Sequence, residues 1–181
     1  MWKEIAEIIK TYESTFGTLA GVAVGSVVTQ LVKSSGKLKF FKTRRYVDFK
    51  IRKPDGMGGY TPHDAPDKNK ATNVDIELEL EIYNPSETPK ILREIEFCFY
   101  KKKRLLFKIR PEDKSTEKFS AAYHHREEIK NISVPPKAIV NLELVKYIGR
   151  DNIEDIKECN RLFLEMKDHK DKKHKVFVCD Y

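Results

Sequence analysis

A strict alternation of apolar and acidic residues runs from Val74 to Tyr83. Its acids are Asp75, Glu77, Glu79 and Glu81, and its apolar residues are Val74, Ile76, Leu78, Leu80 and Ile82. Because successive side chains of a strand point to opposite faces, this pattern predicts a strand with one buried and one wet face. Such strands are typical of antiparallel sheets. The segment stops at Asn84-Pro85, a turn signal that removes a backbone donor.

Short strand patterns recur through the rest of the chain. Tyr46–Arg52 alternates in the same way, and Ile95–Tyr100 and Leu105–Arg110 flank a KKKR turn as a predicted hairpin. A helix capped by Asp151 or Asn152 is expected to run to about Asn160. Further strands are predicted at 129–134, 139–147, 162–167 and 175–179, the last two as a closing hairpin. Seven or eight short strands with one short helix predict a mainly β fold, an antiparallel β-sandwich over residues 46–181.

One segment inside this sandwich has no strand pattern. Residues 54–73 contain three prolines and three glycines, and we expect a long flexible loop there. As a binding loop it would offer Tyr60 and His63.

The N-terminal part of the chain has a different character. Nineteen consecutive residues, 14–32, have no ionisable side chain, although 35% of the whole chain is charged. A helix of this length spans roughly 28 Å, close to the ~30 Å hydrocarbon thickness of a bilayer. Residues 1–32 are therefore predicted to form an interfacial turn and a transmembrane helix, with Trp2 and Tyr12 at the headgroups. The alternative places residues 14–32 inside the core of a wholly soluble protein.

Small residues recur every four positions within this segment, at Gly17, Gly21, Gly25 and Thr29. On a helix they lie along one face and allow a second backbone to approach closely. The pattern predicts helix–helix association through this face, and hence a homodimer. The alternative is that the glycines are only tolerated there.

A basic segment, residues 33–45, follows the predicted span. It contains no acid, and its cations are Lys33, Lys37, Lys39, Lys42, Arg44 and Arg45. Only Lys3 and Lys10 are basic before the span, so the positive-inside rule predicts a single-pass cell-membrane protein with its N-terminus outside and its C-terminal domain in the cytoplasm. The same cations are expected to contact anionic lipid headgroups, or to act only as a stop-transfer signal. Three widely spaced cysteines agree with a reducing compartment.

Residues 74–99 resemble the LEA-14 (water stress and hypersensitive response, WHy) group. The resemblance lies in the alternating strand that ends at Asn84-Pro85 and in Ile91–Phe97, which leads into the next strand. It implies an immunoglobulin-like sandwich, which members of that group often place after an N-terminal membrane helix. It implies no functional residues, and the group's extracytoplasmic placement differs from the orientation that the charges favour.

Residues typical of catalysis or cofactor binding do not occur in a recognisable arrangement. The sequence has no phosphate-binding glycine loop and no HExxH motif. The adjacent His124 and His125 would point to opposite faces of a strand and could not easily share one metal ion. The sequence therefore predicts no catalytic, cofactor or metal site. His169 and His174 are expected to flank a solvated turn. The acidic ladder of residues 75–81 predicts basic residues opposite it, supplied by Lys101 to Arg104, Lys108 or Arg110.

These observations favour a membrane-anchored, non-enzymatic interaction or scaffold module that presents its sandwich to an unidentified protein partner. The alternative function is single-stranded nucleic-acid binding, because basic and aromatic residues interleave at Lys37–Tyr46 and Phe97–Phe107 and the net charge is +7.

Overall fold

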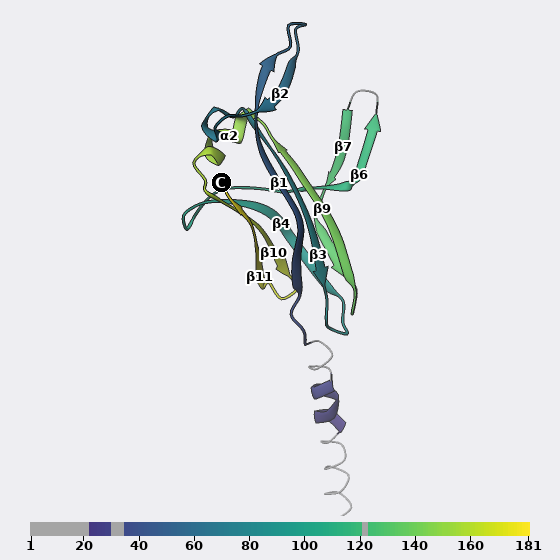
Figure 1. Cartoon of the computed structure of the whole chain (residues 1–181). Coiled ribbons are helices and arrows are strands. Elements are labelled where there is room, and N and C mark those ends of the chain that lie inside the picture. The colour runs from purple at the N-terminus through teal and green to yellow at the C-terminus, as the bar shows by residue number, and fades with distance from the viewer. Residues whose placement is uncertain (1–21, 30–34, 121–122) are drawn as a thin grey trace, which may run out of the picture.

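The chain folds mainly into β-strands arranged as two antiparallel sheets (Figure 1). The structure is a computed structural model that describes residues 22–29, 35–120 and 123–181. The larger sheet has the order β2-β1-β3-β9-β6-β7, and its strands are β1 (Lys39–Pro54), β2 (Tyr60–Asp64), β3 (Asn73–Tyr83), β6 (Glu112–Ser120), β7 (Tyr123–Glu128) and β9 (Ile139–Ile148). The smaller sheet has the order β11-β10-β4-β5, with β8 also paired to β4, and its strands are β4 (Lys90–Lys101), β5 (Arg104–Ile109), β8 (Asn131–Val134), β10 (Arg161–Asp168) and β11 (Lys173–Asp180).

The sequence prediction of a mainly β, two-sheet fold is confirmed. The described part of the chain holds eleven strands rather than seven or eight. The hairpin around the KKKR turn is present as β4–β5, and the closing hairpin is present as β10–β11.

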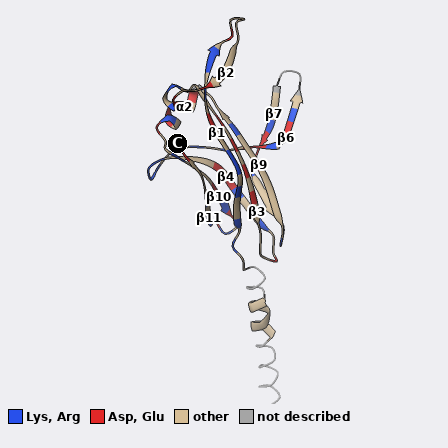
Figure 2. Ribbon diagram, viewed as in Figure 1, with Lys and Arg blue, Asp and Glu red and all other residues tan. Residues whose placement is uncertain are grey.

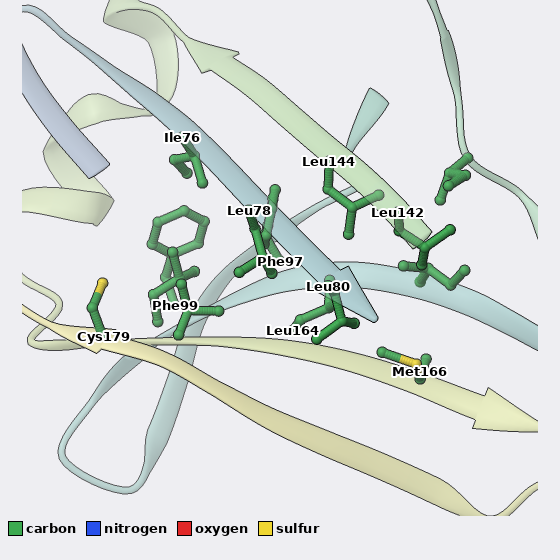
Figure 3. Packing of buried hydrophobic residues seen from close by; sticks show 14 of the residues in the cluster. Ile76, Leu78, Leu80, Phe97, Phe99, Leu142, Leu144, Leu164, Met166 and Cys179 are labelled. Carbon is green, nitrogen blue, oxygen red and sulfur yellow. The ribbon is translucent and has the colours of Figure 1, made fainter. Parts of the chain in front are cut away.

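Strand β3 is the centre of the larger sheet and pairs with both β1 and β9. Its burial alternates as the sequence predicts: Val74, Leu78 and Ile82 are fully buried, while the acids between the apolar residues are half-buried. The apolar face of β3 packs against the smaller sheet. Figure 3 shows the side chains of Ile76, Leu78 and Leu80 lying close to Phe97 and Phe99 of β4 and to Leu164 of β10.

A buried asparagine holds the turn after β3 together. Asn84 is fully buried, and its side-chain amide donates to the carbonyl oxygens of Thr88 at 2.8 Å, Val134 at 3.0 Å and Pro135 at 3.1 Å. Its Oδ1 accepts hydrogen bonds from the backbone N and the Oγ of Ser86. One side chain therefore joins the β3–β4 turn to the end of β8.

The helix after β9, α2 (Arg150–Lys157), begins two or three residues earlier than expected. Its N-cap is Gly149, which makes no side-chain capping hydrogen bond, so the prediction of a cap at Asp151 or Asn152 is wrong. Ile153 and Ile156 of α2 are buried in the core, as is Cys159 just after the helix.

Three segments differ from the sequence prediction. Strand β1 begins at Lys39, seven residues before the predicted Tyr46, so most of the predicted juxtamembrane segment 33–45 is part of the sheet. The expected loop at 54–73 contains strand β2 and a short 3-10 helix, η1 (Lys68–Lys70), and β1 and β2 form a hairpin that projects from the sandwich (Figure 1). The β6–β7 hairpin also projects, and its strands were not predicted.

Candidate interaction sites

The predicted membrane segment is described only in part. Residues 22–29 are helical, and the remainder of segment 14–32 lies outside the described residues. All eight helical residues are exposed, and Val22 and Val24 are each 63% exposed. Figure 2 shows this helix without a charged residue, whereas the sandwich strands carry both signs of charge. Within the described residues, no helix is both long and apolar enough to cross a lipid bilayer.

The alternative that buries residues 14–32 in the sandwich core does not hold for residues 22–29. The earliest core residue in the described part of the chain is Leu38, and the core is filled by side chains of the two sheets and α2. These eight residues are thus an apolar surface that the sandwich does not cover.

Two of the four predicted helix-association residues lie in this helix. A methyl group added at Gly25 would meet no atom within 4 Å, so this face of the helix is open. Thr29 Oγ1 donates a 2.7 Å hydrogen bond to the carbonyl oxygen of Gly25 and thereby satisfies its hydroxyl within the helix. Gly17 and Gly21 lie outside the described residues.

The described members of the six cations predicted to contact lipid do not form one continuous surface. Lys33 lies outside the described residues, and Lys37 is exposed just before β1. The others belong to β1, where Lys42 Nζ and Arg45 Nη1 each donate to the carbonyl oxygen of Val178 at 2.9 Å. Arg44 lies 3.5 Å from Glu79, and Lys39 pairs with Tyr83 in the strand register. Strand β1 therefore uses Lys42 and Arg45 to join the edge strand β11 of the other sheet.

The acidic ladder on β3 is balanced by basic residues, as the sequence predicts, but the partners differ. Glu77 pairs with Lys114 of β6 at 3.1 Å, and Glu79 pairs with Arg44 of β1. Burial raises the pKa of Asp75, and the nearby positive charge of Lys50 partly opposes this rise. The predicted partners bind elsewhere: Lys108 pairs with Glu96, and Lys101 pairs with Glu158.

The outer face of the smaller sheet holds a buried carboxylate. Glu165 of β10 is 5% exposed, and it accepts a 2.6 Å hydrogen bond from the hydroxyl of Tyr100. Lys173 and Lys175 of β11 form ion pairs with it. Burial by itself would raise the pKa of Glu165, but the hydrogen bonds from Lys173, Tyr100 and Lys175 outweigh burial and lower the pKa from 4.5 to about 2.

Aromatic rings surround this carboxylate. Lys175 Nζ lies 3.6 Å from the ring centroid of Tyr100 and 4.0 Å from that of Phe163. Phe163 also packs edge-on against Phe177 at 5.5 Å between centroids. Beside them is a cavity of about 230 Å³, in which Lys108, Lys167 and Lys173 are each paired with a glutamate. The three lysines that line this cavity are thus each paired within the sheet.

All three thiols are buried. Burial raises the pKa of Cys98 to about 12, with a further contribution from the neighbouring Glu165, and burial raises the pKa of Cys159 to about 11. Because the thiolate is the reactive form, none of these cysteines has the surroundings of a nucleophile.

Each of the two projecting hairpins carries an exposed aromatic residue; Tyr60 was predicted for a binding loop, whereas Phe119 was not predicted. At the tip of β6–β7, Phe119 is 75% exposed and packs edge-on against His124 at 4.6 Å between centroids. On the β1–β2 hairpin, Tyr60 is 60% exposed and lines a cavity of about 390 Å³ with Arg52, whose guanidinium donates to the hydroxyl of Tyr147 at 2.7 Å. His63, the other residue predicted for a binding loop, contacts Thr61 on β2.

Comparison with known proteins identifies the family. The family model described as the YopI Ig-like domain matches residues 36–179. The chain belongs to this family. It is also 38% identical over 178 residues to the SPbeta prophage-derived uncharacterized protein YopI of Bacillus subtilis, covering 98% of each chain. No solved structure matches.

The YopI Ig-like domain has limits that agree with the described sandwich. The matched residues begin at Gly36, three residues before β1, and end at Cys179 in β11. Residues 22–29 lie outside the domain, yet the similarity to the prophage protein covers all but three of the 181 residues. The N-terminal segment is therefore part of what the two chains share. The resemblance to the LEA-14 group stays a prediction.

The nucleic-acid alternative loses much of its support in this YopI Ig-like domain. Of the second basic–aromatic stretch, Phe97 and Phe99 are fully buried in the core and Tyr100 is 8% exposed. Bases stack on exposed rings, so these three aromatics offer no platform for a single strand. In the first stretch only Phe41 and Tyr46 have rings that are largely exposed.

The histidines and acids of the described residues do not form a cluster of three or more groups able to hold a metal ion. His124 contacts Glu117 at 3.1 Å, and His174 contacts Asp168 at 3.2 Å. His169 and His174 both lie at the β10–β11 turn, as predicted, where they line the same small cavity.

Proposed function

We propose that this protein is a membrane-anchored interaction module, in which an N-terminal helix in the bilayer holds the YopI Ig-like domain close to the lipid surface. The observation that carries the proposal is the apolar helix of residues 22–29, whose residues are all exposed and uncharged. It lies within a stretch of nineteen residues that lack ionisable side chains. An apolar surface that the protein's own core does not cover marks a site of contact with lipid or with another chain.

The sandwich would then act by position rather than by catalysis. It would present a surface near the bilayer to a protein partner, and its projecting hairpins β1–β2 and β6–β7 offer exposed aromatic residues for such contact. The charge asymmetry around the segment favours a single-pass protein of the cell membrane, with the sandwich in the cytoplasm.

Extraction of membranes at alkaline pH tests the anchor. We expect the full chain to stay in the membrane pellet, and the variant Val24→Lys/Val28→Lys to move to the supernatant, because a lysine at the centre of a span costs about 2.5 to 3.5 kcal/mol. The matched control, Lys53→Ala/Lys103→Ala, changes two exposed sandwich residues and should stay in the pellet. Release of the unaltered chain as a monodisperse species would refute the anchor.

The orientation needs a reporter thiol, because the three native cysteines are buried. Met57, at the tip of the β1–β2 hairpin, is 95% exposed, so Met57→Cys provides one. The proposal expects a membrane-impermeant maleimide to label this variant only after the cells are lysed. Labelling of intact cells would place the sandwich outside.

The glycine face extends the proposal to a homodimer. Gly25 has open space beside it, and Gly21 stands four residues earlier in the sequence. Gly21→Ile or Gly25→Ile should abolish dimers in a membrane association assay, whereas Val27→Ile, on the side of the helix away from Gly25, should leave them intact. Unchanged association in the glycine variants would contradict the homodimer.

A further inference from the structure

A small cavity lies at one corner of the sandwich, where three segments meet. They are residues 36–38 just before β1, Lys90 at the start of β4, and the turn that joins β10 to β11. The cavity has a volume of about 170 Å³. Four lysines line this corner cavity: Lys37, Lys90, Lys170 and Lys172. Two histidines, His169 and His174, line it as well.

Among the described residues that line the corner cavity, Asp168 is the one that carries a carboxylate. Its Oδ1 accepts hydrogen bonds from the backbone N of Lys170 at 2.8 Å and of Lys172 at 3.0 Å, and its Oδ2 lies 3.2 Å from His174 Nε2. Asp168 therefore sets the shape of the turn. Among the described residues, no carboxylate lies within 4.0 Å of the ammonium groups of Lys37, Lys170 or Lys172.

The walls of the corner cavity are held by contacts on several sides. Gly36 has a φ of +128°, and a Cβ there would lie 3.1 Å from the backbone N of Ser86, so this position requires glycine. Leu38 is buried in the core, and the ring of His174 packs against Phe40 at 5.4 Å between centroids. Arg93 Nη2 donates a 2.8 Å hydrogen bond to Asp171 Oδ1, which fixes the other side of the turn. The cations are thus presented by a defined backbone.

The corner cavity differs from the cavity on the outer face of the smaller sheet in how its lysines are paired. There, the three lysines Lys108, Lys167 and Lys173 are each paired with a glutamate. In the corner cavity, Lys37, Lys170 and Lys172 have no carboxylate partner among the described residues, and the carboxylate of Asp168 is already hydrogen-bonded. The positive charge of these three lysines would favour an anion bound beside them.

We propose that the corner cavity binds a phosphate group. Its volume is below the roughly 300 Å³ at which sites for drug-sized ligands begin, and it suits a compact anion. Lysine ammonium groups bind phosphate as point charges, and several of them can contact different oxygens of one group. The phosphate could belong to an acidic lipid headgroup or be free in solution. The site consists of sandwich residues, so the proposal does not rest on the membrane anchor.

Titration of the full chain in neutral detergent micelles with inorganic phosphate, at constant ionic strength set by chloride, tests the site. The ring resonances of His169 and His174 report binding by nuclear magnetic resonance. We expect saturable shifts, and at least about tenfold weaker binding in Lys170→Gln/Lys172→Gln, because the double variant removes two ammonium groups that would contact the anion. The control Lys53→Gln/Lys103→Gln loses the same charge far from the cavity and should bind as the unaltered chain does.

Two further samples separate the sources of the phosphate. The full chain is placed in nanodiscs of phosphatidylcholine alone or of phosphatidylcholine with phosphatidic acid. Histidine shifts that appear with phosphatidic acid, and are lost in Lys170→Gln/Lys172→Gln, identify the headgroup as ligand; shifts with added inorganic phosphate alone identify a soluble phosphate. Absence of saturable shifts in every sample, or equal binding by both double variants, would overturn the proposal. The micelle sample does not require insertion into a bilayer, so its outcome is independent of the anchor.

Discussion

Valine side chains are buried in the sandwich and exposed in the N-terminal helix. Val74, Val134 and Val178 of the sandwich are completely buried between the two sheets, whereas Val22 and Val24 of the helix are each 63% exposed. The two sheets of the sandwich cover one another, and no described residue before Leu38 contributes to the core. The sandwich therefore completes its own apolar interior, whereas the described core leaves the valines of residues 22–29 uncovered.

The largest expected difference between the two regions concerns core packing. Phe97 is fully buried at the centre of the sandwich, and Phe97→Ala should lower the free energy of unfolding by about 4 kcal/mol, because it removes buried area and leaves a cavity. Val24→Ala should leave that free energy unchanged in detergent micelles. Urea unfolding followed by circular dichroism measures both variants. An equal loss of unfolding free energy in the two variants would contradict this difference between the sandwich and the helix.

Buried hydrogen bonds in the sandwich give the next effect. Asn84→Ala should cost about 3 kcal/mol of unfolding free energy, because it leaves buried carbonyl groups and the backbone N of Ser86 without their partner. Thr29→Val removes the helix hydroxyl that bonds within its own helix and serves as the matched change outside the sandwich. We expect no change in sandwich stability from Thr29→Val. A loss below about 1 kcal/mol in Asn84→Ala would show that solvent reaches the β3–β4 turn.

The buried carboxylate of the smaller sheet adds a pH dependence that the helix lacks. The pKa of Glu165 is about 2 in the folded chain against an ordinary value of 4.5, so its contribution to stability is present above pH 4.5 and is lost as the pH falls toward 2. The difference between these pKa values corresponds to about 3 kcal/mol. Glu165→Gln, which keeps a partner for Tyr100, should cost about 2 kcal/mol at pH 7.

Unfolding of Glu165→Gln and the unaltered chain across pH 2 to 7 checks this assignment. The stability difference should shrink through the window between pH 4.5 and 2. The control is Glu96→Gln, whose partner Lys108 has a largely exposed side chain and which should therefore have the smaller effect. A difference between Glu165→Gln and the unaltered chain that does not vary with pH would show that hydrogen-bond geometry, not charge, gives Glu165 its effect.

The smallest effect is expected at Arg44, which was predicted to contact lipid. Its side chain is 63% exposed and lies 3.5 Å from Glu79, so Arg44→Ala should change the unfolding free energy by less than about 1 kcal/mol. Arg45→Ala should cost more, because Arg45 joins β1 to the carbonyl of Val178 in the other sheet. Equal losses of unfolding free energy in the two variants would indicate that the hydrogen bond from Arg45 to Val178 adds little to the stability of the sandwich.

Much of the sandwich could be predicted because its strands alternate in burial. The pattern of β3 and the turn residues around β4–β5 and β10–β11 are local signals, and a local signal is readable from sequence. Strands β6 and β7 were not predicted because they project from the sandwich and are polar. The segment Glu112 to Ser120 has few apolar residues, so no alternation of apolar and polar residues can be read in it. Strand β2 escaped because Pro62 stands within it, which is tolerated there at the edge of the sheet.

The charged contacts were less predictable, because they depend on which strands become neighbours. The β3 ladder is balanced by Arg44 and Lys114, from strands 35 and 37 residues away, rather than by the nearby KKKR turn. The buried role of Glu165 and the corner cavity likewise arise from long-range pairing of β4, β10 and β11. The excess of lysine around His169 to His174 was the one signal in the sequence that pointed to the corner cavity.

Depth-dependent fluorescence quenching compares the two regions in one experiment. A fluorophore is attached to Val24→Cys or to Met57→Cys in the full chain, which is reconstituted into vesicles containing lipids with nitroxide groups on their acyl chains. We predict strong quenching of the label at residue 24 and none at residue 57, because the helix lies in the hydrocarbon and the hairpin tip lies in water. Equal, weak quenching at both positions would contradict the account, since residues 22–29 would then lie outside the lipid.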